Sequence, residues 1–143
     1  MKAEELMIGD WLFYKGQVAA FPFKVEQITK KKVGYHAEPC ENRMHYLILS
    51  ECDPIPLTPE ILEKNGFEKF PFHHIKNQHV WSFHQDMRIF VDLSTRKLND
   101  NPVNGWSISI SSTCTSEMIH KIDYVHELQH ALKFSKIDKK IEL

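Results

Sequence analysis

Histidine and glutamate side chains come together in this sequence in a pattern that can support metal chemistry. His126, Glu127 and His130 form the motif HExxH. On a helix, two histidines four residues apart share a face and can hold one zinc ion, and the glutamate can act as general base on a zinc-bound water. The motif therefore raises the hypothesis of a zinc-dependent, metallopeptidase-like hydrolase, with Glu127 as the catalytic group and zinc as the cofactor.

A catalytic zinc ion also needs a third protein ligand and an open position for water. The short segment after His130 offers only Asp138 or Glu142. The upstream segment FHHIKNQHVWSFH offers four further histidines, namely His73, His74, His79 and His84. The sequence places neither group beside the helix, and a motif with two unspecified positions also arises by chance. The balance favours a protein that is not an enzyme and has no cofactor.

The helix that carries the motif has its own apolar stripe, made of Val125, Leu128 and Leu132. At about 100° per residue, His126 lies roughly 130° and His130 roughly 170° from the centre of that stripe. This geometry suits a zinc-binding helix and an ordinary surface helix equally. In the structural interpretation, His126 contacts backbone groups at the start of the helix, whereas His130 is more exposed and easier to replace.

Two weaker constellations lead to other functions. Cys114 with His120 or His126 could form a thiol nucleophile, but a Ser/Thr-rich strand end favours an idle thiol. The basic run Lys30–Lys32 could contact nucleic acid, although lysines on a turn usually form a solvated tip. We therefore expect neither activity.

The composition limits the class of protein. The chain has 143 residues, of which 42% are hydrophobic and 26% charged, with a formal net charge of −1. These values exclude a disordered chain and argue against a dedicated nucleic-acid binder. No apolar run is long enough to cross a membrane, and the acidic start lacks the features of a signal peptide. The three cysteines, Cys40, Cys52 and Cys114, form no CxxC pair, which is typical of reduced thiols in the cytoplasm.

The first third of the chain predicts short strands separated by turns. The apolar runs that indicate them span residues 6–14, 23–28, 33–35 and 44–49. Closely spaced short strands favour a small, strongly bent sheet or barrel. Their order, with Gly9-Asp10 before the first long run and a basic turn before the third, resembles the opening of SH3-like barrels. We expect residues 1–56 to form such a lobe.

The remaining residues, 57–143, predict an α+β lobe, joined to the first in one compact unit. Thr58 as cap, Pro59 at the first helical position and Gly66 after the end predict a linking helix from Pro59 to Asn65. An antiparallel sheet should follow, packed by the C-terminal helix. The expected elements are strands at 80–85, 87–94 and 106–112, a polar loop at 95–105, a helix from about 123 to 134 or 135, and an edge strand at 139–143.

The predicted core of this lobe joins two strand faces to the helix stripe. One strand face consists of Met87, Ile89, Val91 and Leu93, and the other of Trp106, Ile108 and Ile110. Each set alternates with other residues, as expected of strands with one buried face. Burial of these positions against the stripe Val125, Leu128 and Leu132 is the test of the architecture.

Two segments, PIPLTPEILEKNGF at 54–67 and YVHELQHAL at 124–132, resemble a group of short uncharacterised proteins of bacteria and their phages. In that group the second segment often reads VHQLQN, without the glutamate and the second histidine. The resemblance implies that the structural signature is Tyr124, Val125, His126, Leu128 and Gln129. It also implies a phage or mobile-element accessory protein that acts through protein contacts and self-association.

Overall fold

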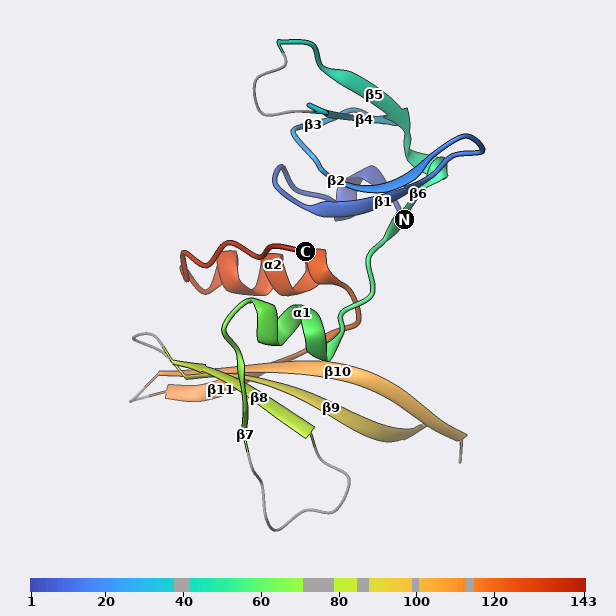
Figure 1. The fold of residues 1–143 in the computed structure, drawn as a ribbon. Helices are drawn as coiled ribbons and strands as arrows, with labels where there is room; N and C mark the ends of the chain where they lie inside the picture. The colour runs from blue at the N-terminus through green and yellow to red at the C-terminus, as the bar shows by residue number, and fades with distance from the viewer. Residues whose placement is uncertain (38–41, 71–78, 85–87, 99–100, 113–114) are drawn as a thin grey trace. The chain divides into compact units, whose positions relative to one another are not determined.

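The computed structural model describes residues 1–37, 42–70, 79–84, 88–98, 101–112 and 115–143. The chain forms two compact units. Unit 1 comprises Met1–Pro56 and Tyr124–His126, and unit 2 comprises Leu57–Asp123 and Glu127–Leu143. Figure 1 labels the strands and helices along the chain. Among the described residues, antiparallel sheets and two α-helices occur together, so the predicted α+β class is confirmed.

Unit 1 contains two three-stranded antiparallel sheets, with strand orders β2-β1-β6 and β3-β4-β5. Their strands are β1 (Trp11–Lys15), β2 (Ala20–Lys24), β3 (Gln27–Ile28), β4 (Lys32–Tyr35), β5 (His45–Ile48) and β6 (Cys52–Pro54). The predicted strand at 23–28 is divided into β2 and β3. The division falls at Val25 and Glu26, where the Val25 N–H donates to the Asp10 carbonyl and the Glu26 N–H donates to the Gly34 carbonyl.

The core of unit 1 is formed by apolar side chains of both sheets and of the segments next to their strands. Its buried residues are Leu6, Leu12, Phe23, Val25, Val33, Leu49 and Cys52. A 3-10 turn at Leu49–Glu51 leads into β6, which returns to pair with β1. The described residues of unit 1 form two sheets rather than a closed barrel, so the SH3-like barrel stays a prediction.

Unit 2 is built on a five-stranded antiparallel sheet of order β11-β10-β9-β8-β7. Its elements are α1 (Pro59–Lys64), β7 (Glu68–Phe70), β8 (His79–His84), β9 (Arg88–Leu98), β10 (Asn101–Ser112), β11 (Thr115–Ile122) and α2 (Val125–Phe134), which begins in unit 1. Figure 1 shows α1 and the part of α2 after His126 on one face of this sheet.

The linking helix α1 begins where the sequence predicts. The Thr58 hydroxyl accepts a hydrogen bond from the Ile61 N–H at 3.4 Å, and Pro59 occupies the first turn. Gly66 has a φ of +75°, the left-handed conformation that glycine adopts most easily after a helix. The last helical residue is Lys64 and Asn65 is the C-cap. The predicted helix is therefore confirmed.

The predicted polar loop at 95–105 is wrong. Most of these residues lie in β9 and β10, which pair from Asn101 opposite Leu98 to Gly105 opposite Ser94. A long hairpin ladder satisfies backbone groups that a loop would leave to water, and this pairing outweighs local turn propensity. Pro102 is tolerated because β11 pairs with β10 only from Trp106 onward, so β10 is an edge strand at Pro102. Strands β7 and β11 were not predicted.

The predicted core positions of unit 2 are buried or half-buried wherever the structure describes them. Val91, Trp106 and Ile108 are buried on the sheet, while Ile110 is half-buried. The helix stripe of α2 is buried as well, at Val125, Leu128 and Leu132. The side chains of Met87, Ile89 and Leu93 lie outside the described residues.

The C-terminal tail at 139–143 is not the edge strand that we expected. It is fixed instead by the buried side chain of Asn65. The Asn65 Nδ2 group donates to the carbonyl of Glu142 at 2.7 Å and to that of Ile61 at 2.8 Å. The Glu142 N–H donates back to Asn65 Oδ1 at 2.9 Å. These bonds satisfy the tail without a strand partner, and Ile141 is buried beside them.

Candidate functional site

The HELQH segment lies at the start of α2, as predicted. The helix begins at Val125, whose N–H donates to the Ile55 carbonyl at 2.9 Å, and Tyr124 forms a β-bridge with Pro56. These contacts fix the turn from which the helix begins. The start is two residues later than the predicted Asp123.

His126 is a packed side chain. It is only 6% exposed, and its Nδ1 atom is buried. The imidazole stacks on the Tyr124 ring, with centroids 5.9 Å apart and an interplanar angle of 15°. The burial of His126 agrees with the structural interpretation, whereas the expected hydrogen bonds to backbone groups at the helix start stay a prediction.

Glu127 is engaged by the backbone of the strand-to-helix turn. Its Oε2 atom accepts a hydrogen bond from the Asp123 N–H at 2.6 Å. As the third residue of α2, it places a carboxylate in the first helical turn, where the helix dipole favours negative charge. The Asp123 carboxylate in turn pairs with Lys121 Nζ at 2.7 Å. The arrangement is a capping interaction, and it occupies an oxygen that a general base would use.

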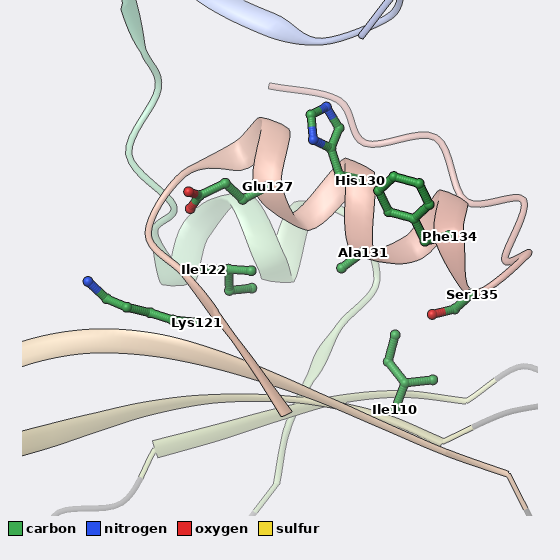
Figure 2. A pocket seen from close by; sticks show the side chains of 8 residues that line it. All are labelled: Ile110, Lys121, Ile122, Glu127, His130, Ala131, Phe134 and Ser135. Atoms are coloured by element: carbon green, nitrogen blue, oxygen red, sulfur yellow. The ribbon is translucent and has the colours of Figure 1, made fainter. Parts of the chain in front are cut away.

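Glu127 and His130 line a cavity of about 270 Å³ within unit 2. Figure 2 shows this cavity between α2 and the sheet residue Ile110. The His130 ring points away from Ile110 in Figure 2, and its centroid lies 6.5 Å from that of the Phe134 ring. The remaining lining residues are Lys121, Ile122, Ala131 and Ser135.

The predicted third zinc ligands are not brought to this helix by any described contact. His73 and His74 lie outside the described residues, as do the side chains of His79 and His84. Asp138 and Glu142 are exposed. Within the described ranges, no three histidine, cysteine, aspartate or glutamate side chains gather as a metal site would require.

The predicted thiol nucleophile, Cys114, lies outside the described residues, as do Cys40 and the side chain of His120. Cys52 is a buried free thiol in the core of unit 1. Burial raises the pKa of the Cys52 thiol to about 11, with help from the nearby charges of Glu51 and Asp53. A thiol with so high a pKa is a poor nucleophile at neutral pH.

A different candidate site, which the sequence did not reveal, is the edge strand β5. Leu49 N–H donates to the Lys31 carbonyl at 2.9 Å, and the β4–β5 register places Ile48 opposite Lys32 and Tyr46 opposite Gly34. Because pairs alternate along an antiparallel ladder, these two pairs are non-hydrogen-bonded. The Tyr46 N–H and C=O groups and the Ile48 N–H therefore point away from β4, toward the open edge, whereas the Ile48 carbonyl accepts a hydrogen bond from the Cys52 thiol at 3.5 Å.

The same two residues expose their side chains, at 51% for Tyr46 and 48% for Ile48. They lie on one face of β5, because side chains two residues apart point the same way. The Tyr46 hydroxyl donates to Gln27 Oε1 at 2.5 Å, which holds the ring over the sheet. An edge with outward backbone groups and exposed apolar side chains is a surface on which another strand can pair.

The other edge strands carry groups that discourage such pairing. Natural edges are usually blocked by charged residues or proline. By sequence, β2 contains Pro22 and Lys24, β6 contains Asp53 and Pro54, β7 contains Glu68 and Lys69, and β11 contains Glu117 and Lys121. The edge strand β3 is two residues long. Among the described edges of greater length, β5 (HYLI) alone has no proline and no acidic or basic residue other than histidine.

Three lysines lie at the end of this edge. Lys30 and Lys31 form the turn between β3 and β4, closed by the Thr29 N–H donating to the Lys32 carbonyl at 2.9 Å. All three lysines are exposed. Within the described part of the chain, no carboxylate forms an ion pair with Lys30, Lys31 or Lys32.

No protein-family model, curated protein or solved structure matches this chain. In the described part of the chain, neither helix has the length and apolar character needed to cross a membrane.

Proposed function

We propose that this chain is a non-enzymatic protein that binds another protein chain through the edge strand β5. The observation that carries the proposal is the combination, at Tyr46 and Ile48, of outward backbone groups with exposed side chains on an edge without charge or proline. Strand addition to such an edge is a common mode of peptide recognition, in which backbone hydrogen bonds supply affinity.

The environment of the HELQH segment supports a non-enzymatic role. Glu127 accepts the Asp123 N–H and His126 is packed on Tyr124. Both side chains thus contribute to the turn that starts α2, which is a sufficient structural reason for their presence.

The resemblance to short bacterial and phage proteins suggests the biological setting. We propose a phage or mobile-element accessory protein that works in the cytoplasm. The strand order of unit 1 supports a relation to SH3-like barrels, because β6 follows a 3-10 turn and returns to pair with β1.

Site-specific photo-crosslinking tests the proposed function. A benzophenone amino acid replaces Tyr46 in one variant and Phe13, an exposed aromatic residue of the central strand β1, in the control. In cells that express each variant, we expect irradiation to give cross-linked adducts of higher mass for the variant at position 46 and not for the control at position 13. Equal adducts from both positions, or none from position 46, would contradict binding at β5.

A second candidate function is a zinc-dependent hydrolase, because Glu127 and His130 line the same cavity. In this proposal His126 and His130 hold zinc, Glu127 is the general base, and His73, His74, His79 or Asp138 supplies the third ligand. Elemental analysis of protein purified without chelator decides between the candidates. One zinc per chain, lost in both His126→Ala and His130→Ala, would favour the hydrolase; zinc-free protein would reject it.

A further inference from the structure

We propose that β5 accepts an extended acidic peptide as an added strand, with carboxylates of the peptide lying against Lys30, Lys31 and Lys32. The inference rests on the proposed function and names the chemistry of the partner. It follows from the backbone, the apolar surface and the charge around the edge.

The backbone of β5 sets the spacing of the contacts. Tyr46 and Ile48 direct their N–H groups to the open edge, two residues apart, whereas Leu47 faces β4. An extended peptide repeats its own donors and acceptors at the same two-residue interval. The two strands therefore match without rearrangement of the sheet.

The side chains beside the edge form an apolar surface. Gly34, opposite Tyr46, has no side chain, and an added Cβ there would lie 2.8 Å from the Met44 sulfur. Met44, the residue before β5, thus packs over Gly34, beside Tyr46. Alternate side chains of an added strand would contact this surface, which favours a peptide with apolar or β-branched residues at every second position.

The charge at the end of the edge selects the sign of the peptide residues that extend past Ile48, where Lys32 shares a face of the sheet with Ile48. Lys32 lies directly opposite Ile48, and the Lys31 carbonyl accepts the Leu49 N–H, so the basic turn adjoins the end of β5. The three ammonium groups have no carboxylate partner among the described residues. Because the whole chain has a formal charge of only −1, this basic cluster is local, and a local cluster attracts a complementary partner.

Proline substitution separates backbone pairing from side-chain contact. Ile48 has a φ of −77°, close to the value of about −65° that proline requires. Its N–H points away from β4, so Ile48→Pro removes an outward donor and leaves the internal ladder intact. Ile48→Ala is the matched control, since it removes the exposed side chain and keeps the N–H.

Fluorescence anisotropy with the full chain measures the binding. The probe is a labelled decapeptide in which alternating valine and threonine are followed by a run of glutamates at one end, and the comparison peptide has lysine in place of glutamate. We expect the acidic peptide to bind at least about tenfold more tightly than the basic one, a difference of about 1.4 kcal/mol. Ile48→Pro should weaken acidic-peptide binding by about tenfold, and by more than Ile48→Ala does.

The double variant Lys31→Glu, Lys32→Glu tests the charge without altering the edge backbone. We expect it to lose the preference for the acidic peptide, and the matched double variant Lys133→Glu, Lys140→Glu in unit 2 to retain it. The preference should also decrease as salt rises, because these lysines are exposed.

Several results would overturn the inference. If both peptides bind equally and both weaken in Ile48→Pro, strand addition and the proposed function stand, but the acidic partner is wrong. If neither peptide binds and the chain is a dimer that Ile48→Pro makes monomeric, a second copy occupies the edge. If a labelled single-stranded DNA oligomer binds instead, and Ile48→Pro does not change its affinity, the three lysines bind nucleic acid and the acidic peptide is wrong. If no peptide binds to a monomeric chain, the inference is wrong, and the crosslinking at position 46 judges the proposed function separately.

Discussion

The HELQH segment of α2 and the edge strand β5 differ in whether their polar groups are available to a binding partner. The first carries residue types that can bind metal and move protons, yet Glu127 accepts a turn N–H and His126 is packed on Tyr124. The second carries no catalytic motif, but it directs backbone groups and apolar side chains outward. The comparison teaches that residue types alone do not locate a functional site. The groups that the fold leaves available to a partner are the stronger guide.

The largest expected effect comes from the buried face of α2. Leu128 is 0% exposed, so Leu128→Ala should destabilise the fold by about 2–5 kcal/mol through lost burial and a residual cavity. Urea unfolding, followed by circular dichroism, measures this change. The control is Phe134→Ala on the same helix, which is 70% exposed and should change stability by less than about 0.5 kcal/mol. Equal losses in both variants would show that α2 does not pack through this face.

The next largest expected effect is a difference in stability between variants of His126 and His130. His126→Ala should destabilise the fold by about 1–2 kcal/mol, because the buried imidazole stacks on Tyr124. His130→Ala should stay within about 0.5 kcal/mol of the parent chain. Thermal melts with and without chelator measure both. If both variants lost the same stability, and chelator lowered the stability of the parent chain by the same amount, a zinc ion shared by the two histidines would be supported instead.

Glu127 gives a smaller effect that defines its role. Glu127→Ala removes the acceptor of the Asp123 N–H and should cost about 1 kcal/mol, as the loss of a helix cap does. Glu127→Gln keeps an oxygen acceptor and should cost less. The free energy of unfolding, measured in urea, separates the two variants. A Glu127→Gln loss as large as that of Glu127→Ala would contradict the capping role.

The smallest expected effect is the alkylation of the Cys52 thiol near neutral pH. Its raised pKa of about 11 leaves about one thiolate in a thousand at pH 8, so an alkylating reagent should modify native Cys52 very slowly. Because the folded pKa exceeds the unfolded one, the stability that this thiol contributes is present below the unfolded pKa and decreases as pH rises toward 11. Mass spectrometry of the alkylated peptide measures reactivity. Rapid native modification of Cys52 at pH 8 would contradict its burial.

Local signals explain which parts of the fold the sequence predicted. Thr58, Pro59 and Gly66 define both ends of α1 within a few residues, so the helix was predictable. The β9–β10 hairpin was predicted too short, because its polar residues between 95 and 105 pair with one another across the hairpin, and this pairing outweighs their local turn propensity. The C-terminal tail was misassigned for a different reason, since its partner Asn65 lies far away in the sequence.

The two candidate sites also differ in how much of each could be predicted from local sequence signals. The position of HELQH on a helix was predictable from its apolar stripe, and the glutamate in the first helical turn was a capping signal that the metal hypothesis obscured. Strand β5 was also predicted from its apolar run. Its status as an uncharged edge was not, because edge position depends on the order β3-β4-β5 and on the register of the β4–β5 ladder.

Amide hydrogen exchange in β5 tests the central claim most directly. Followed residue by residue by NMR, the Leu47 amide, which faces β4, should exchange slowly, whereas the Tyr46 and Ile48 amides should exchange rapidly in the free chain. Adding the acidic decapeptide should slow exchange at Tyr46 and Ile48 and leave Leu47 unchanged. Slow exchange at Tyr46 and Ile48 in the free monomer, or no change on adding the peptide, would contradict strand addition at β5.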